Sequence, residues 1–209
     1  MQVYTLPLGA YQANCYVLID ADGAAAVVDP GECAPELMAL LHDKTASVEQ
    51  ILLTHGHADH ISGAAALREL TGAGICIHAL DDSFTDSDLC MARDCGYAFA
   101  PFKADRLLSD GDTVRFGRET LRALHTPGHT PGGVCYLHDA DRVLFSGDTL
   151  FCLTAGRSDF PRGSYDDLMR SLARLRDLPG DWKVYPGHER ATTLDAERRR
   201  NFFMRRLGK

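Results

Sequence analysis

The stretch QILLTHGHADHISGAAALREL, residues 50–70, constrains the fold more than any other part of the sequence. It begins with a short apolar run typical of a buried strand, and it ends with the apolar spacing of a helix. Between the two lie three histidines and one aspartate: His55, His57, Asp59 and His60. This polar cluster stands where a strand ends and a helix begins, and in layered α/β proteins such strand ends usually hold the ligand.

The spacing within this cluster suits metal binding. Residues two apart in an extended segment point the same way, so His55 and His57 can converge on one ion. Asp59 and His60, further round the turn, can face a second ion. Imidazole and carboxylate ligands suit zinc, and iron or manganese is also compatible. The alternative is a surface loop whose histidines are incidental.

Further candidate ligands follow strand-like segments elsewhere in the chain. HTPGHTPGG contains His129, FSGDTLF places Asp148 after the apolar run RVLF, and VYPGHE places His188 after another strand. His125, near His129, either orients a metal-bound group or packs as an ordinary histidine. Glycines beside the ligands, Gly187 among them, are interpreted as scaffold residues that permit close approach.

Strands and helices alternate along the chain. About ten short segments rich in Val, Ile, Leu, Tyr and Phe predict strands. Helices are expected after Pro35, after Ser62, from a capping box at Ser164, and from a cap at Thr192 or Thr193. This mixture predicts packed layers of sheet and helix. No repeat or linker divides residues 1–209, so we expect a single domain.

The segment 81–105 is interpreted as an insertion or lid at the substrate entrance. Polar and aromatic residues alternate along it without the regular spacing of a helix or a strand. Its four aromatic residues either supply apolar contacts to a substrate or anchor the segment to the core: Phe84, Tyr97, Phe99 and Phe102.

Composition narrows the functional classes. The net charge of −7 disfavours binding to nucleic acid. The longest apolar run, Ala24 to Val28, is too short to span a membrane, and the N-terminus lacks the pattern of a signal peptide, so a cytoplasmic protein is expected. Seven cysteines without a CxxC pair predict neither a disulfide framework nor a thiolate zinc site.

The sequence resembles the metallo-β-lactamase superfamily and, within it, the compact bacterial type of glyoxalase II, or hydroxyacylglutathione hydrolase. The matching motifs span nearly the whole chain: GAYQANCYVL, THGHADH, HTPGHTPGG, FSGDTLF, GRSDFPRGS and YPGHE. The resemblance implies an α+β fold, the αββα sandwich of two mixed β-sheets flanked by helices. It also implies a ligand set in which His55, His57 and His129 hold one metal, Asp59, His60 and His188 hold a second, and Asp148 bridges them.

The activity that the resemblance implies is metal-dependent hydrolysis of thioesters such as S-lactoylglutathione. Two divalent metal ions per chain, zinc by expectation, would generate a hydroxide near neutral pH, so no serine or cysteine nucleophile is needed. Asp59 is the expected catalytic residue, because it can bind the second metal and steer the hydroxide. The expected partner is a small-molecule thioester, and the oligomeric state stays open.

The chain departs from glutathione-specific relatives in two places. Their C-terminal helical domain is not expected here, because only about twenty residues follow His188, and the loop TAGRSDFPRGS offers Arg157 and Asp159 where they carry a lysine and a tyrosine. Arg157 is a candidate for binding a substrate carboxylate. The alternative is an internal ion pair between Arg157 and Asp159.

Other functions share parts of the pattern. Mononuclear-iron persulfide dioxygenases resemble this chain in THGHADH and in a GR-D-F loop, but their usual Ala-His-Asp differs from Gly187, His188 and Glu189 here. Many β-lactamases carry cysteine at the position of Asp148. A non-enzymatic binding protein on a degenerate fold is disfavoured by the intact ligand set.

Overall fold

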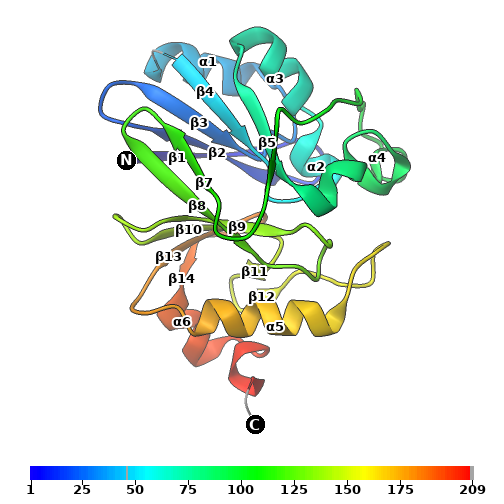
Figure 1. Ribbon diagram of the computed structural model, residues 1–209, viewed down its shortest axis with the longest axis vertical. Coiled ribbons are helices and arrows are strands. Elements are labelled where there is room, and N and C mark those ends of the chain that lie inside the picture. The colour runs from blue at the N-terminus through cyan, green and yellow to red at the C-terminus, as the bar shows by residue number, and fades with distance from the viewer. Residues whose placement is uncertain (46, 208–209) are drawn as a thin grey trace.

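The computed structural model describes residues 1–45 and 47–207. It shows two six-stranded sheets packed face to face, with helices on both outer faces (Figure 1). This is the αββα sandwich of the α+β class, and it confirms the fold expected from the sequence.

The first sheet is mixed. Its strands pair in chain order, antiparallel from β1 to β3 and parallel from β3 to β6. Their bounds are β1 (Gln2–Leu8), β2 (Ala13–Ile19), β3 (Ala24–Val28), β4 (Ser47–Leu52), β5 (Gly74–His78) and β6 (Arg106–Leu108).

The second sheet is also mixed. Its order is β14-β13-β10-β9-β8-β7, and only β10 and β13 run parallel. Its strands are β7 (Thr113–Phe116), β8 (Glu119–His125), β9 (Val134–His138), β10 (Val143–Gly147), β13 (Lys183–Pro186) and β14 (Thr192–Thr193). A separate ribbon pairs β11 (Leu150–Phe151) with β12 (Thr154–Ala155).

Helices cover the outer faces of both sheets. The first sheet carries α1 (Pro35–Lys44), α2 (Ala58–Ile61) and α3 (Ala64–Thr71), and the second carries α5 (Tyr165–Arg176) and α6 (Leu194–Arg200). Side chains of Ser164 and Thr193 cap α5 and α6, as the sequence predicts. The described chain also contains 3₁₀ turns at Ala79–Phe84, Asp88–Cys90 and Met204–Arg206.

Three apolar layers hold the sandwich together. Every residue of β2 is buried because both of its faces are covered. Cys15, Val17 and Ile19 face the helices, while Tyr16 and Leu18 face the second sheet. A third layer joins the second sheet to α5 and α6. The central layer fixes the two sheets against each other, and with them the strand ends that carry the polar motifs.

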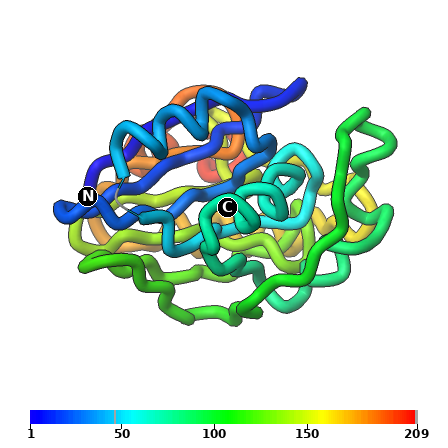
Figure 2. Tube along the Cα trace, turned by 90° about the horizontal axis from the view of Figure 1, so that it is seen from above, coloured from blue at the N-terminus to red at the C-terminus, as the bar shows by residue number. Residues whose placement is uncertain are grey.

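The segment 81–105 begins within the 3₁₀ turn Ala79–Phe84 and contains the 3₁₀ turn Asp88–Cys90 and helix α4 (Ala92–Cys95). Figures 1 and 2 place it at the same end of the sandwich as the loop before α5. Phe84 and Phe102 are buried in the apolar core, and Tyr97 and Phe99 pack against it. The aromatic residues therefore anchor the segment.

All seven cysteines are free thiols. Within residues 1–45 and 47–207, no helix combines the length and the apolar character needed to cross a membrane.

Candidate metal centre

The polar motifs meet at one end of the sandwich, because each follows the C-terminal end of a strand. His55 and His57 follow β4, and Asp59 and His60 lie within α2. From the second sheet, the turn after β8 supplies His129, while Asp148 and His188 follow β10 and β13. The placement of Asp59 and His60 differs from the sequence interpretation, which left them in a turn. Helix α2 begins directly after His57 and fixes both side chains.

The first cluster consists of His55, His57 and His129. All three are buried, and one ring nitrogen from each lies within 4.8 Å of the others. His57 Nδ1 is 2.9 Å from His129 Nε2. Three imidazoles at this spacing can share one metal ion.

The second cluster consists of Asp59, His60 and His188, whose ligand atoms also lie within 4.8 Å of one another. Asp59 Oδ2 is 3.2 Å from His188 Nε2 and 3.7 Å from His60 Nε2. One carboxylate and two imidazoles form a second set that can hold a cation.

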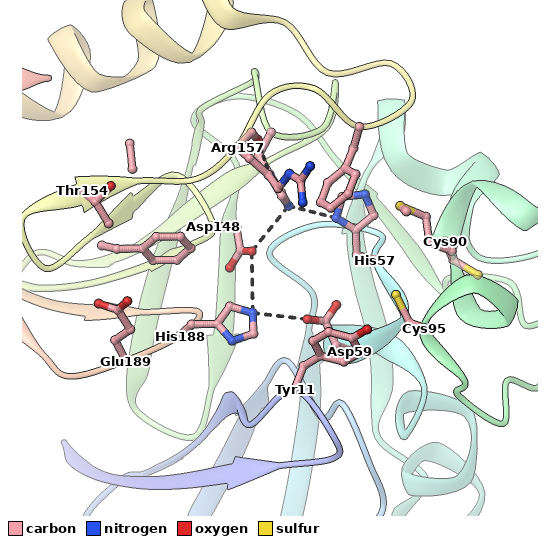
Figure 3. Close-up of a pocket in the computed structure, with 15 residues that line it drawn as sticks. Tyr11, His57, Asp59, Cys90, Cys95, Asp148, Thr154, Arg157, His188 and Glu189 are labelled. Carbon is pink, nitrogen blue, oxygen red and sulfur yellow. Dashed lines mark hydrogen bonds and ion pairs between the residues drawn. The ribbon is translucent and has the colours of Figure 1, made fainter.

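Asp148 lies between the clusters. Its Oδ2 is 3.4 Å from His129 Nε2 in the first cluster, and its Oδ1 is 3.4 Å from His60 Nε2 in the second. Figure 3 shows this carboxylate between His57 and His188. Asp148 is therefore placed to contact ions held by either cluster.

Hydrogen bonds behind the clusters orient the imidazoles. His60 Nδ1 bonds to Asp29 Oδ2 at 3.0 Å, and His129 Nδ1 bonds to the Arg157 carbonyl at 2.7 Å. His55 Nδ1 lies 3.0 Å from Thr54 Oγ1, which donates to Asp29. Because these bonds engage Nδ1 of each ring, Nε2 is the nitrogen turned toward the clusters, which is the usual arrangement behind metal-binding histidines.

Unpartnered polar atoms show that these residues fit a metal. Four buried side-chain atoms of the clusters have no hydrogen-bond partner among the described residues: His55 Nε2, His57 Nε2, His60 Nε2 and Asp148 Oδ1. Buried polar atoms without partners are costly, so their concentration at one point indicates cation ligands. Gly187 leaves the needed space, because a Cβ there would lie 2.1 Å from Asp148 Oδ1.

Electrostatics differ between the clusters. Burial lowers the pKa of His55 well below its usual value and that of His57 to about 3, with neighbouring imidazoles adding to the effect. Burial also opposes charge on His60, but the carboxylates of Asp59 and Asp148 outweigh it and raise the pKa to about 10. His55 and His57 therefore favour the neutral form that binds metals, and at His60 a cation would displace a proton.

Two buried aspartates stiffen the site. Asp29 supports His60 and Thr54 as described above, and Asp81 ties together the loops that carry the first cluster. Asp81 accepts hydrogen bonds from Gly56 N at 3.0 Å, and from Thr130 Oγ1 and Gly132 N at 2.6 Å each. Sequence reasoning missed both residues. The position of Asp29 just after β3 was a usable signal, since the expected ligands also follow strands.

His125 does not face the clusters. Its ring stacks on His78 with centroids 4.1 Å apart, and its Nε2 bonds to the Pro131 carbonyl at 2.9 Å. The sequence left open whether His125 orients a metal-bound group or packs, and the structure shows packing.

A pocket of about 430 Å³ opens onto the clusters. Tyr11, Cys90 and Cys95 lie on one side of it, and Thr154 and Glu189 lie on the other (Figure 3). Residues of the segment 81–105 therefore line the pocket, although its four aromatic residues do not.

Arg157 lies at the rim of this pocket. Its guanidinium donates to both carboxylate oxygens of Asp159, at 2.7 and 2.8 Å, and lies 4.1 Å from the centre of the Phe160 ring. Of the two alternatives for Arg157, the structure shows the ion pair.

Comparison with known proteins identifies the family. The family model described as Metallo-beta-lactamase superfamily matches residues 8–188, a range that includes every residue of both clusters. The chain belongs to the metallo-β-lactamase superfamily. Hydroxyacylglutathione hydrolase GloC from Haemophilus influenzae is 34% identical to it, over 98% of each chain.

Two solved structures are similar to the chain along nearly their whole length. BLEG-1, a B3 metallo-β-lactamase, is 33% identical with a TM-score of 0.91, over 97% of this chain and 99% of its own. TTHA1623, solved in a di-iron-bound form, is 36% identical with a TM-score of 0.87, over 96% of this chain and 100% of its own.

Proposed function

We propose that the protein is a dinuclear metal-dependent hydrolase that cleaves thioesters such as S-lactoylglutathione. The observation that carries the proposal is the position of Asp148, which lies 3.4 Å from a ring nitrogen of each cluster. A carboxylate shared by two ligand sets suits a pair of ions better than a single one. The di-iron form of TTHA1623 and the name of the Haemophilus relative support the same proposal.

The metal-binding side chains would have different roles. His55, His57 and His129 would hold one ion, Asp59, His60 and His188 the other, and Asp148 both. Bound there, divalent ions supply Lewis acidity toward a carbonyl and lower the pKa of water to near neutrality. The Asp59 carboxylate stays ionised, because His60 and His188 more than offset the effect of burial on its pKa. It can therefore accept a hydrogen bond from the attacking water and orient it.

The pocket suits a small acyl substrate. Asp59 and His188 line it, and its volume lies within the usual range for small-molecule sites. A thiolate leaving group is a soft ligand that such ions stabilise well. Since bound ions would activate water, the thiols of Cys90 and Cys95 would not be needed for attack.

A second candidate function is β-lactam hydrolysis. The similarity to BLEG-1 favours it, because the two chains match along nearly their full lengths. The same cluster geometry can act on a strained amide carbonyl as well as on a thioester carbonyl. A chromogenic cephalosporin should therefore be tested beside the thioesters.

The test compares zinc-loaded with iron-loaded protein. Metal analysis should give about two ions per chain, since seven ligands exceed what one tetrahedral zinc uses. Zinc-loaded protein should release free thiol from S-lactoylglutathione with or without air, and it should consume no oxygen with glutathione persulfide. Oxygen uptake confined to the iron-loaded sample, without thioester cleavage in either sample, would instead indicate a persulfide dioxygenase.

A further inference from the structure

The walls of the pocket are apolar on both sides of the clusters. Tyr11, Cys90 and Cys95 line one side and Thr154 lies on the other, while Met91, Phe151, Ala155 and Phe160 complete the lining. Figure 3 shows the cysteines and Thr154 facing each other across the metal-binding side chains. A hydrocarbon group can be buried between these walls without leaving a buried polar group that lacks a hydrogen-bond partner.

Charge at the rim is the second observation. Apart from the cluster residues and Asp148, the charged side chains that line the pocket in the described chain are Arg157 and Glu189. The Asp159 carboxylate neutralises Arg157 through two hydrogen bonds. Glu189 remains as an exposed carboxylate beside His188. Among the described residues, the pocket lining therefore offers no unpaired side-chain cation to a substrate carboxylate.

Two nearby arginines lie outside the pocket lining, although Arg190 offsets part of the charge of Glu189. Arg162 donates to Ser83 Oγ at 2.9 Å, and Arg190 points its Nε at Cys152 Sγ, 3.4 Å away. Neither arginine lines the pocket. A substrate arm with carboxylates would meet a neutral ion pair and a like charge, and such unfavourable contacts are how binding sites reject a competitor.

We propose that the pocket selects thioesters whose arms are uncharged and apolar, and that it discriminates against thiols that carry carboxylates, glutathione among them. This inference rests on the proposed hydrolase function and narrows its substrate class. Arg157 then acts as a structural residue, which holds Asp159 and covers Phe160.

Binding of uncleavable thioethers tests the selectivity directly. Zinc-loaded protein is titrated by calorimetry with S-hexyl-N-acetylcysteamine, which is neutral, and with S-hexylglutathione, which carries two carboxylates. The neutral ligand should bind at least about tenfold more tightly, a difference that corresponds to about 1.4 kcal/mol. Equal or tighter binding of S-hexylglutathione would overturn the proposal.

A pair of charge variants tests the location of the effect. Thr154→Lys adds an ammonium inside the pocket and should tighten S-hexylglutathione binding several-fold. Leu153→Lys adds the same charge on the adjacent residue, which is 45% exposed and does not line the pocket, and should leave that binding unchanged. An equal gain in both variants would show a long-range charge effect and refute the assignment to the pocket walls.

The proposed function and the selectivity fail in different ways. Protein that binds the two thioethers with the expected ratio but cleaves no thioester retains the pocket assignment and loses the hydrolase function. Protein that cleaves S-lactoylglutathione and prefers S-hexylglutathione retains the function and loses the selectivity.

Discussion

Substitution of Asp81 should loosen the first metal cluster and destabilise the fold together. This carboxylate is fully buried and accepts hydrogen bonds from Gly56, Thr130 and Gly132. Gly56 lies between His55 and His57, while Thr130 follows His129. Asp81 therefore joins the two loops that carry the cluster. We call this three-bond link the clamp, and it is lost when the Asp81 side chain is removed.

The magnitude follows from the donors left behind. Asp81→Ala leaves three buried donors without their acceptor, and each unsatisfied donor costs about 1–3 kcal/mol. Burial raises the pKa of Asp81, so removing the charge returns part of this loss. We expect a net decrease of about 3 kcal/mol in the free energy of unfolding, and about half of that for Asp81→Asn, which keeps one acceptor.

Urea unfolding and chelator competition measure the two effects. Asp82→Ala is the matched control, because Asp82 is adjacent and only its backbone carbonyl accepts hydrogen bonds in the described structure. Asp81→Ala should release one metal ion per chain at a lower chelator concentration than the control does. Equal stability and equal metal retention in the two variants would refute the clamp.

Three further predictions concern single residues. Asp148→Ala should lower the affinity for both metal ions, and a variant that keeps two ions with near-normal turnover would disprove the bridging role. Gly187→Ala should impair metal binding while far-UV circular dichroism stays unchanged, because the new Cβ would lie 2.1 Å from Asp148 Oδ1; metal content is the readout. Burial and His125 lower the pKa of His78 to about 4, so between pH 6.5 and pH 4 the unfolded chain takes up a proton that the folded protein does not. The control is His78→Asn, which keeps an acceptor for Leu80 N. As the pH falls from 6.5 to 4, the free energy of unfolding of the wild type should decrease by about 2–3 kcal/mol more than that of the variant. Urea midpoints that change in parallel for the two proteins would contradict this.

The sequence was enough to predict the layered fold and the grouping of seven polar side chains. Each of those residues belongs to a short contiguous motif at a strand end, and strand ends converge at one edge of the sandwich. The short elements were not predictable in this way. Strands β11, β12 and β14 have two residues each, too few to show a period.

The supporting residues were missed for a different reason. Asp81 lies 25 residues from Gly56 and 51 from Gly132, so its role depends on tertiary contacts that leave no local pattern. The ion pair of Arg157 with Asp159 was visible as an alternative, but its preference over a substrate contact depends on side-chain geometry.

Each cluster draws its members from both halves of the sandwich. In the three-histidine cluster, His55 and His57 follow a strand of the first sheet and His129 follows a strand of the second. In the other cluster, Asp59 and His60 belong to the half of the first sheet and His188 to the half of the second sheet. A bound ion would therefore act as a cross-link between the halves. Ligands that bind only the folded state stabilise it by mass action. The lifetime of this protein in a cell should accordingly follow the supply of free metal, so that metal starvation removes the protein as well as its activity.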